Sequence, residues 1–261
     1  MTDTIEKKVI PKVVHYCWFG HNPLPQSAKL CIDSWKKYLP DYEIKEWNEG
    51  NFDVNSIPYT AEAYKLKKYA FVSDYARFLI LNKFGGLYFD TDVEIVAPLD
   101  DIVENGPFMG CERIPMKKIL PNVDSVILEN AVNPGVGMGA IPGMKLFDEV
   151  LKVYEKKHFV SLKGNVTGTI VHTLCALLVS KKIEDLGNNI FSIDGLTVYP
   201  VDYFCPKDYY SGEMIVTRNT VCVHHYSATW VEQKGSCMKH FFQKVRFLFV
   251  RLKISLLFNV R

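Results

Sequence analysis

The sequence predicts a single α/β domain built on a central, mostly parallel sheet. Short apolar strands alternate with amphipathic helices over the first hundred residues, and the first strand is apolar along its length. Such a strand is typical of the centre of a parallel sheet that is covered on both faces. With 261 residues, 48% of them hydrophobic and 13% aromatic, the chain is long enough for one α/β domain with a sizeable core.

The first hundred residues follow the order β-α-β-α-α-β, which implies parallel strands joined by right-handed crossovers. The expected elements are a strand within 10–20, a helix over 27–38, a strand over 42–48, a helix over 60–68, a helix over 71–81 and a strand over 87–89. Further on, we expect a strand over 106–111 and a helix over 144–158.

The chain is organised around the stretch from Ala70 to Glu94. Two glycines at 85–86 end the central helix, because the residue after a helix commonly needs a positive φ. Asp90 and Asp92 follow the short apolar strand, and in an extended chain they point to the same side. Two such carboxylates repel each other unless a positive group lies between them, and a hard divalent cation that also holds phosphates is the natural candidate. The alternative is a pair of solvated turn residues.

Asp74 and Arg77 lie three residues apart on the preceding helix, so they share a face and either pair on the surface or bind one polar ligand. With the glycines and aspartates, they form a pattern that resembles the DxD-containing sugar transferases of the GT-A fold, a Rossmann-like fold that binds nucleotide sugars. The match is greatest to the bacterial capsule and lipopolysaccharide transferases of glycosyltransferase family 32, which includes yeast initiating α-mannosyltransferases, and the clostridial glucosylating toxins share it. The matching residues are Ser73, Asp74, Arg77, Gly85, Gly86, Tyr88, Asp90 and Asp92.

The resemblance implies a metal-dependent, retaining enzyme that moves a hexose from a nucleoside diphosphate sugar to a sugar hydroxyl. Asp92 then contacts the metal, Mn²⁺ or Mg²⁺, and the diphosphate, while Asp90 takes a second metal position or the ribose. Asp74 and Arg77 hold the hydroxyls of the donor sugar, and Arg77 adds positive charge. Asp90, Asp92 and Arg77 are thus the expected catalytic residues.

Two further segments resemble the same family. Trp18 ends the first strand, where the family's tryptophan stacks on the nucleotide base; the alternative is a core tryptophan. Residues 129–143 interleave glycine and proline with apolar residues, which excludes a helix and indicates a close approach of the backbone. The resemblance implies that Asn133 or Gly135 touches the transferred sugar, and the alternative is a glycine-rich hairpin.

A late strand over 221–230 ends in polar residues. His225, Ser227 and Trp230 are similar to the family's closing histidine and Ser-Trp pair, which implies that they close over the diphosphate. We expect His225, rather than His224, to complete the metal shell with Asp90 and Asp92. The alternative is a structural histidine.

The charge distribution separates residues 1–237, the expected transferase domain, from a basic segment at 238–261. The last 26 residues hold six Lys or Arg and no acidic residue, which leaves 25 basic against 29 acidic residues in the rest. An acidic body argues against nucleic-acid binding. Residues 238–261 have apolar residues at helical spacing, so we expect a basic amphipathic helix that contacts anionic membrane; the alternative is a helix packed on the domain.

Seven scattered cysteines without a Cys-x-x-Cys pair, no signal peptide and no long apolar run favour a cytoplasmic protein, peripheral on the inner face of the cytoplasmic membrane. We expect a UDP-hexose donor, with GDP-mannose and α-mannosyl transfer as the alternative. The acceptor is a glycan or a lipid-linked sugar in capsule or O-antigen synthesis.

Other function classes remain open: an Asp-x-Asp-x-Thr phosphatase, a non-catalytic carbohydrate-binding protein and a nucleotide-binding regulator. Glu94 occupies the position where such a phosphatase carries its threonine, which disfavours that class.

Overall fold

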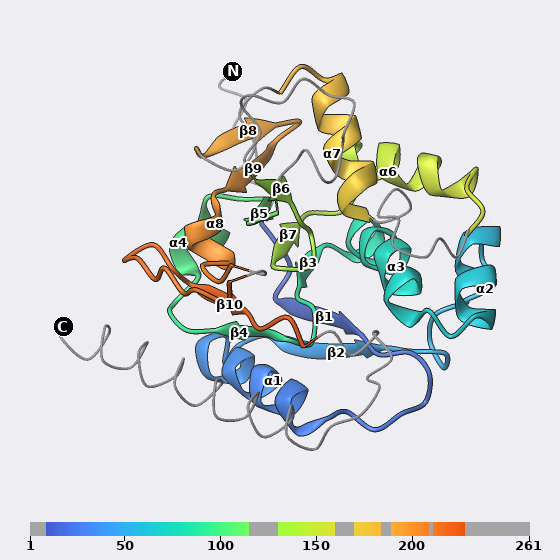
Figure 1. Ribbon diagram of the computed structural model, residues 1–261, viewed down its shortest axis with the longest axis horizontal. Coiled ribbons are helices and arrows are strands. Elements are labelled where there is room, and N and C mark those ends of the chain that lie inside the picture. The colour runs from blue at the N-terminus through green and yellow to red at the C-terminus, as the bar shows by residue number, and fades with distance from the viewer. Residues whose placement is uncertain (1–8, 115–129, 160–169, 184–188, 209–210, 228–261) are drawn as a thin grey trace, which may run out of the picture.

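A computed structural model describes residues 9–114, 130–159, 170–183, 189–208 and 211–227. Its centre is an eight-stranded sheet with the strand order β2-β1-β3-β7-β5-β9-β8, in which β6 pairs with β5 (Figure 1). The strands are β1 (Val13–Cys17), β2 (Glu43–Trp47), β3 (Gly86–Tyr88), β5 (Phe108–Glu112), β6 (Ala131–Val132), β7 (Met138–Ala140), β8 (Phe191–Ile193) and β9 (Leu196–Tyr199).

Five of these strands run in one direction. β1 is parallel to β2 and β3, and β5 is parallel to β9, while β7 lies between β3 and β5 and is antiparallel to both. β8 is antiparallel at the edge. The predicted α/β fold with a central, mostly parallel sheet is therefore confirmed, and the carboxyl ends of β1, β3 and β5 meet at one edge, where open α/β sheets bind ligands.

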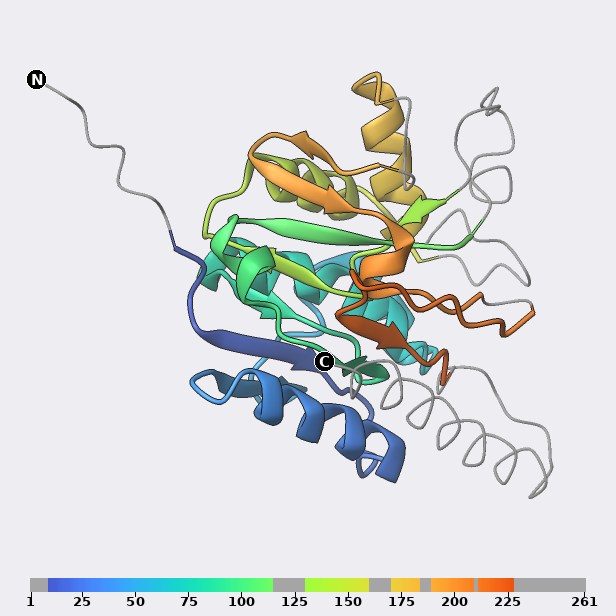
Figure 2. The ribbon, with the colours of Figure 1, turned by 90° about the vertical axis from the view of Figure 1, so that its left-hand side faces the viewer.

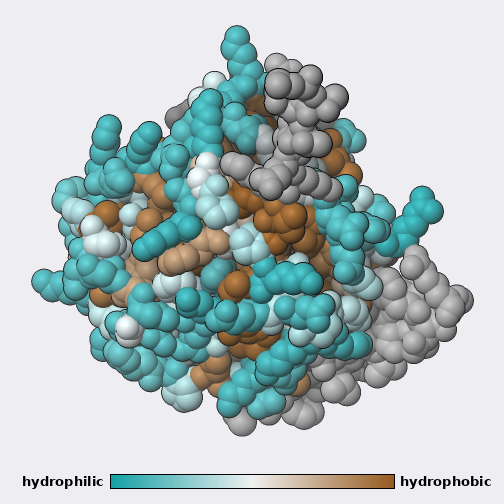
Figure 3. All heavy atoms as spheres, turned by 180° about the vertical axis from the view of Figure 1, so that it is seen from behind, coloured by the Kyte–Doolittle hydropathy of each residue, from teal (hydrophilic) through white to brown (hydrophobic). Residues whose placement is uncertain are grey.

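Helices cover both faces of the sheet. One hydrophobic cluster lies under α2, α3, α6 and α7, and the other lies under α1, α4 and α8 (Figures 1 and 2). The helices are α1 (Gln26–Tyr38), α2 (Pro58–Lys65), α3 (Tyr69–Phe84), α4 (Asp100–Glu104), α6 (Lys145–Glu155), α7 (Ile170–Ser180) and α8 (Val201–Phe204). Seen from behind, the surface is mainly hydrophilic with smaller apolar areas (Figure 3).

The turn from α3 into β3 forms as predicted. Gly85 and Gly86 have φ values of 66° and 99°, and a side chain on Gly86 would come within 2.7 Å of the Val13 carbonyl oxygen. Beyond β3 the chain leaves the central sheet, and β4 (Val93–Ile95) pairs antiparallel with β10 (Cys222–His224).

None of the helices in the described ranges is long and apolar enough to cross a bilayer. The predicted helix over 238–261 lies outside the described residues, as does Trp230, and both stay predictions.

His15 on β1 ties the central turn to the neighbouring strand. The Trp47 indole donates to Nδ1 over 3.0 Å, so Nε2 carries the proton and donates to the Gly85 carbonyl oxygen, also over 3.0 Å. The bond from Trp47 needs a neutral ring, because Nδ1 accepts it, whereas a charged ring would still donate to Gly85. Burial, only partly opposed by the Gly85 bond, lowers the pKa of His15 to about 4.

We therefore expect His15 to make the fold acid-sensitive. A histidine with a folded pKa of about 4 and an unfolded value of about 6.5 contributes its full stability above pH 6.5 and loses it as the pH falls toward 4. Between pH 7 and pH 5 the free energy of unfolding should therefore fall by about 2 kcal/mol. Urea unfolding of the wild type and of His15→Gln across this range measures it: the wild type should lose about 2 kcal/mol more than the variant, and parallel pH profiles would contradict the assignment.

Candidate active site

The candidate site lies where β3 ends beside β1. Asp90 follows β3 by two residues, and the Val93 amide donates to the Asp90 carbonyl oxygen over 3.0 Å. The two aspartates therefore occupy a tight turn and not the extended strand that we predicted, because β4 turns away toward β10. Trp18 follows β1 at the same edge and is half-buried, with its indole nitrogen donating to the Asn22 carbonyl oxygen over 2.6 Å.

Arg77 is a buried cation shared by two carboxylates. It is 4% exposed, and its Nη2 lies 3.2 Å from both Asp74 Oδ1 and Asp90 Oδ1. Its Nε donates to the Ser73 carbonyl oxygen over 3.1 Å. The Tyr88 hydroxyl also donates to Asp90 Oδ1, over 3.0 Å. The predicted pairing of Asp74 with Arg77 is confirmed, but as a buried contact that includes Asp90 and not as a surface pair.

Asp74 joins α3 to α7. Its second carboxylate oxygen accepts from the backbone amide of Ile170, the first residue of α7, over 3.1 Å. Burial raises the pKa of Asp74 to about 6, although Arg77 and this amide lower it. Both oxygens are thus engaged within the protein, and contact of Asp74 with donor-sugar hydroxyls stays a prediction.

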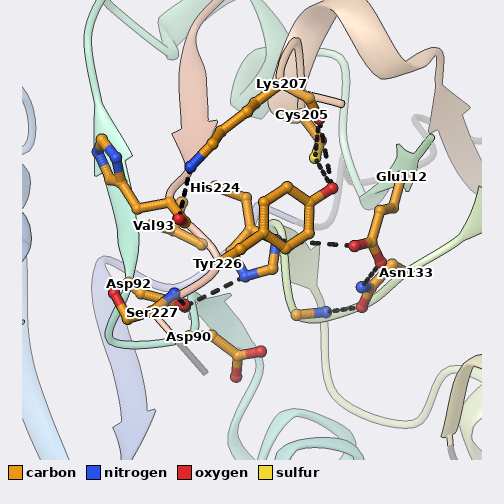
Figure 4. A network of polar contacts seen from close by, with 12 residues as sticks. Asp90, Asp92, Val93, Glu112, Asn133, Cys205, Lys207, His224, Tyr226 and Ser227 are labelled. Atoms are coloured by element: carbon orange, nitrogen blue, oxygen red, sulfur yellow. Dashed lines mark hydrogen bonds and ion pairs between the residues drawn. The ribbon is translucent and has the colours of Figure 1, made fainter. Parts of the chain in front are cut away.

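Asp92 has different partners from Asp90. Its Oδ1 lies 3.2 Å from His224 Nε2, and its Oδ2 accepts from the Ser227 backbone amide over 2.8 Å (Figure 4). Burial by itself raises the pKa of Asp92, but His224 and this amide lower it to about 2. Burial raises the pKa of Asp90, and Arg77 only partly offsets that effect. Each aspartate therefore has its own positive partner.

The preference for His225 over His224 is corrected by the structure. Successive residues of a strand point to opposite faces. His224 at the end of β10 points to Asp92, whereas the His225 ring places Nε2 2.9 Å from Glu94 Oε2, with both side chains 7% exposed. Burial lowers the pKa of His225. Burial also acts to lower the pKa of His224, but Asp92 holds it well above the ordinary value.

The backbone of the glycine-rich segment makes the close approach that we predicted, and its neighbour is Asp90. Contact of Asn133 or Gly135 with the transferred sugar stays a prediction. The Asp90 amide donates to the Gly135 carbonyl oxygen over 3.0 Å, and a Cβ on Gly135 would lie 2.1 Å from Asp90 Oδ2 and 2.9 Å from Arg77 Nη1. Asn133 accepts from the Gly135 amide over 2.8 Å and donates to Glu112. Asn133 and Gly135 thus shape the floor beneath Asp90.

Sequence reasoning missed Glu112 and Cys205, which also lie near His224 (Figure 4). Glu112 is the last residue of β5, and the expected strand stopped one residue earlier. A carboxylate at the carboxyl end of a strand parallel to β3 was the signal that could have found it. Cys205 carries no such signal, because a cysteine is usually a buried hydrophobe.

Asp92 and His224 lie close enough to share a cation, with Asp90 beside them; among the described residues, the three ligand atoms within 4.8 Å of one another are those of Glu112, Cys205 and His224. Two carboxylates and one imidazole suit Mn²⁺ or Mg²⁺. The 3.2 Å between Asp92 Oδ1 and His224 Nε2 is close to the roughly 3 Å that separates neighbouring ligands of an octahedral ion with bonds of about 2.1 Å. The side chains of Asp90 and Asp92 are 30% and 18% exposed, so the ligand set is open on one side.

Residues 25–109 match the family model described as a glycosyltransferase sugar-binding region containing a DXD motif. The uncharacterized glycosyltransferase L373 of Acanthamoeba polyphaga mimivirus is 26% identical over 207 residues, 77% of each chain. Inositol phosphoceramide mannosyltransferase 3 of Schizosaccharomyces pombe is 31% identical over 106 residues, which cover 38% of this chain and 28% of that protein.

Solved structures with similar folds include the PaToxG glycosyltransferase, at 20% identity and a TM-score of 0.44 over 66% of this chain and 70% of that one. Mouse xyloside xylosyltransferase 1 aligns at 13% identity with a TM-score of 0.46, covering 88% and 99% of the two chains. The galactosyltransferase LgtC aligns at 13% identity with a TM-score of 0.41, covering 90% and 95%.

We expect Gly135→Ala to displace the Asp90 carboxylate while the fold survives. The added methyl group overlaps Asp90 Oδ2, at the movable end of a side chain, so the cost in unfolding free energy should be about 1–3 kcal/mol. Mn²⁺ affinity, measured by titration calorimetry, should fall about tenfold or more.

Gly50→Ala is the matched control, because Gly50 lies in a loop where the nearest atom to a new Cβ is Asn48 Oδ1 at 3.1 Å. The control should keep both its stability and its Mn²⁺ affinity. Unchanged Mn²⁺ affinity in a folded Gly135→Ala protein would show that this close approach has no bearing on the metal ligands.

Proposed function

We propose a donor, a metal and residue roles for this chain, which is a glycosyltransferase with a DXD-containing sugar-binding region. Enzymes with this motif generally use a divalent metal and a nucleotide sugar. We infer a GT-A enzyme that transfers a hexose, with retention, from a nucleoside diphosphate sugar to a sugar hydroxyl. The observation that carries the proposal is the pairing of Asp92 with His224 beside Asp90 at the carboxyl edge of the sheet.

The donor's diphosphate is assigned to the Asp90–Asp92 edge, and its base to Trp18. Trp18 follows β1, which is the parallel neighbour of β3, so the indole and the aspartates lie at the same edge. The half-buried indole is anchored by its bond to the Asn22 carbonyl oxygen, which leaves a flat apolar face of the kind that stacks on a nucleotide base.

In this mechanism the residues orient the leaving diphosphate and stabilise its growing charge. Asp90, Asp92 and His224 would hold Mn²⁺ or Mg²⁺, which would supply positive charge to the diphosphate. Arg77 fixes Asp90 from below through its 3.2 Å contact and adds a buried positive charge. The Ser227 amide orients Asp92, and Gly135 leaves room for the Asp90 carboxylate. Such preorganised charge accelerates a reaction without further rearrangement.

A UDP-hexose is the favoured donor, since the Trp18 strand resembles that of the glucosylating toxins. The second candidate is α-mannosyl transfer from GDP-mannose, and the similarity to the inositol phosphoceramide mannosyltransferase favours it. Hydrolysis of a panel of nucleotide sugars with Mn²⁺ separates the two donors without knowledge of the acceptor. Rapid use of GDP-mannose with no use of UDP-hexoses would replace the first proposal by the second.

The acceptor is proposed to be a glycan or a lipid-linked sugar of a cell-surface polysaccharide. Membrane contact through residues 238–261, and a cytoplasmic location on the inner membrane face, belong to the same proposal and rest on the basic, apolar pattern of that segment.

Replacing Asp92 by Asn tests the proposal directly. The substitution keeps size and shape but removes the charge, so metal-dependent hydrolysis of the donor should fall by about 10²–10³-fold, as when one transition-state contact is lost. Donor hydrolysis at saturating Mn²⁺ and thermal melting are the measurements. Asp33→Asn is the control, because Asp33 is exposed on α1 and pairs only with Lys36 at 3.1 Å. Near-normal hydrolysis by folded Asp92→Asn protein would exclude the metal role.

Trp18→Ala should weaken nucleotide binding by about 1–3 kcal/mol, the scale of base–aromatic stacking. A tryptophan with a purely structural role would instead cost about 3–5 kcal/mol of stability. Nucleotide titration and calorimetric melting distinguish the two roles. Trp18→Phe is the matched variant, because it keeps an aromatic face and should retain most of the affinity. A large fall in melting temperature with unchanged affinity would refute stacking.

A further inference from the structure

The side chains of Glu112 and Cys205 converge on His224, on the side of its ring that faces away from Asp92. Glu112 ends β5, Cys205 follows α8, and His224 ends β10. One potential ligand atom from each lies within 4.8 Å of the other two. His224 Nδ1 is 4.0 Å from Glu112 Oε1. A carboxylate, a thiol and an imidazole form a donor set, of which the proposed transferase mechanism uses only the other nitrogen of the imidazole.

The state of His224 Nδ1 points to a missing ligand. The atom is buried and makes no hydrogen bond of ordinary geometry, with Cys205 and Glu112 as its near neighbours, while Nε2 of the same ring lies 3.2 Å from Asp92 Oδ1. A histidine that binds zinc commonly donates its other ring N–H to a carboxylate, which fixes the ring and raises its basicity. Asp92 has this relation to His224. The ring is therefore oriented with one nitrogen on a carboxylate and the other aimed toward Glu112 and Cys205.

The surrounding groups hold the three side chains in place. Asn133 donates to Glu112, and the Tyr226 hydroxyl lies 3.0 Å from Cys205 Sγ. The Tyr226 ring packs on His224, with 4.3 Å between the ring centroids. Tyr226 adopts a φ of 55°, which is uncommon for a bulky residue and concentrates at functional sites.

We propose that Glu112, Cys205 and His224 Nδ1 form a second metal site, which takes a borderline-soft cation such as Zn²⁺. Zinc bonds of about 2.0–2.3 Å to nitrogen, oxygen and sulfur place its ligands about 3.3–3.7 Å apart. The three atoms already lie within 4.8 Å of one another, so small side-chain movements bring them to this spacing. Three protein ligands leave the fourth tetrahedral position for water. The thiolate distinguishes this site from the oxygen-rich site at Asp90 and Asp92, because thiolates select softer ions.

The two sites share His224 and therefore oppose each other. Zinc on Nδ1 keeps the Nε2 proton directed at Asp92, and that nitrogen is then unable to join Asp92 in holding Mn²⁺ or Mg²⁺. Zinc is thus an antagonist of the transferase, a consequence that rests on the proposed function, whereas zinc binding itself does not.

Cobalt titration of the full chain tests the site without an assay of activity. Co²⁺ occupies zinc sites, and a thiolate ligand gives a charge-transfer band in the near ultraviolet, which the Asp90–Asp92 site is unable to produce. The wild type should develop this band to saturation at one Co²⁺ per chain and lose it when Zn²⁺ is added. No thiolate band in the folded wild type would overturn the proposal.

Variants assign the band to residues. Cys205→Ser and Cys205→Ala should abolish it, and Glu112→Gln should weaken Co²⁺ binding about tenfold or more, at least the loss produced by supporting residues of metal sites. Cys175→Ala is the matched control, because Cys175 is equally buried but lies against the Val132 carbonyl oxygen, and it should keep the band. A band that survives in a folded Cys205 variant would overturn the site.

Donor hydrolysis then tests the antagonism. At saturating Mn²⁺, added Zn²⁺ should inhibit the wild type at least tenfold more strongly than Cys205→Ser, whose hydrolysis without zinc is normal. Equal inhibition of both proteins would place inhibitory zinc at the Asp90–Asp92 site and overturn the antagonism. If the wild type hydrolyses no donor, the proposed function fails while the cobalt band still decides the metal site.

Discussion

The candidate site depends on one buried guanidinium. Arg77 contacts Asp74 and Asp90 at 3.2 Å each, and these carboxylates belong to α3 and to the turn after β3, while Asp74 also holds the first amide of α7. Two carboxylates and a cation at this depth are stable only as a set, because removing one partner leaves a buried charge uncompensated. The cation therefore fixes the helix that supports the sheet edge, the aspartate that faces outward and the start of α7, all through one side chain.

The two aspartates have different charged neighbours, and their pKa values shift in opposite directions. Asp90 receives its positive charge from beneath, from Arg77, and burial raises its pKa. The positive partner of Asp92 is His224, which lies to its side and lowers the pKa of Asp92 to about 2. Adjacent carboxylates whose pKa values are pushed apart commonly have different tasks. Asp92 stays ionised beside His224, whereas Asp90 is held by Arg77 and Tyr88.

The features that depend on local sequence pattern could be predicted from the sequence. The features that depend on the register of strand pairing could not. The helix before Gly85, the buried strand after it and the close approach at Gly135 each follow from spacing or from glycine placement. The choice between His224 and His225 depends on how β10 pairs with β4, and a shift by one residue exchanges the two faces. Glu112 was missed because the expected strand ended one residue before it. Cys205 was missed because a cysteine is usually a buried hydrophobic residue. Asp74 was expected to hold donor-sugar hydroxyls or to pair with Arg77 on the surface, because helical spacing shows a shared face but not its burial.

His224 links the two parts of the site through its two ring nitrogens. On one side Asp92 lies at a partly exposed edge, and on the other Glu112 and Cys205 lie close to the ring, against which Tyr226 packs. A neutral imidazole has one donor and one acceptor nitrogen, so a metal on either nitrogen sets the role of the other. The β4–β10 pair therefore does more than extend the fold. By setting which histidine faces inward, it places a single ring between Asp92 on one side and Glu112 and Cys205 on the other.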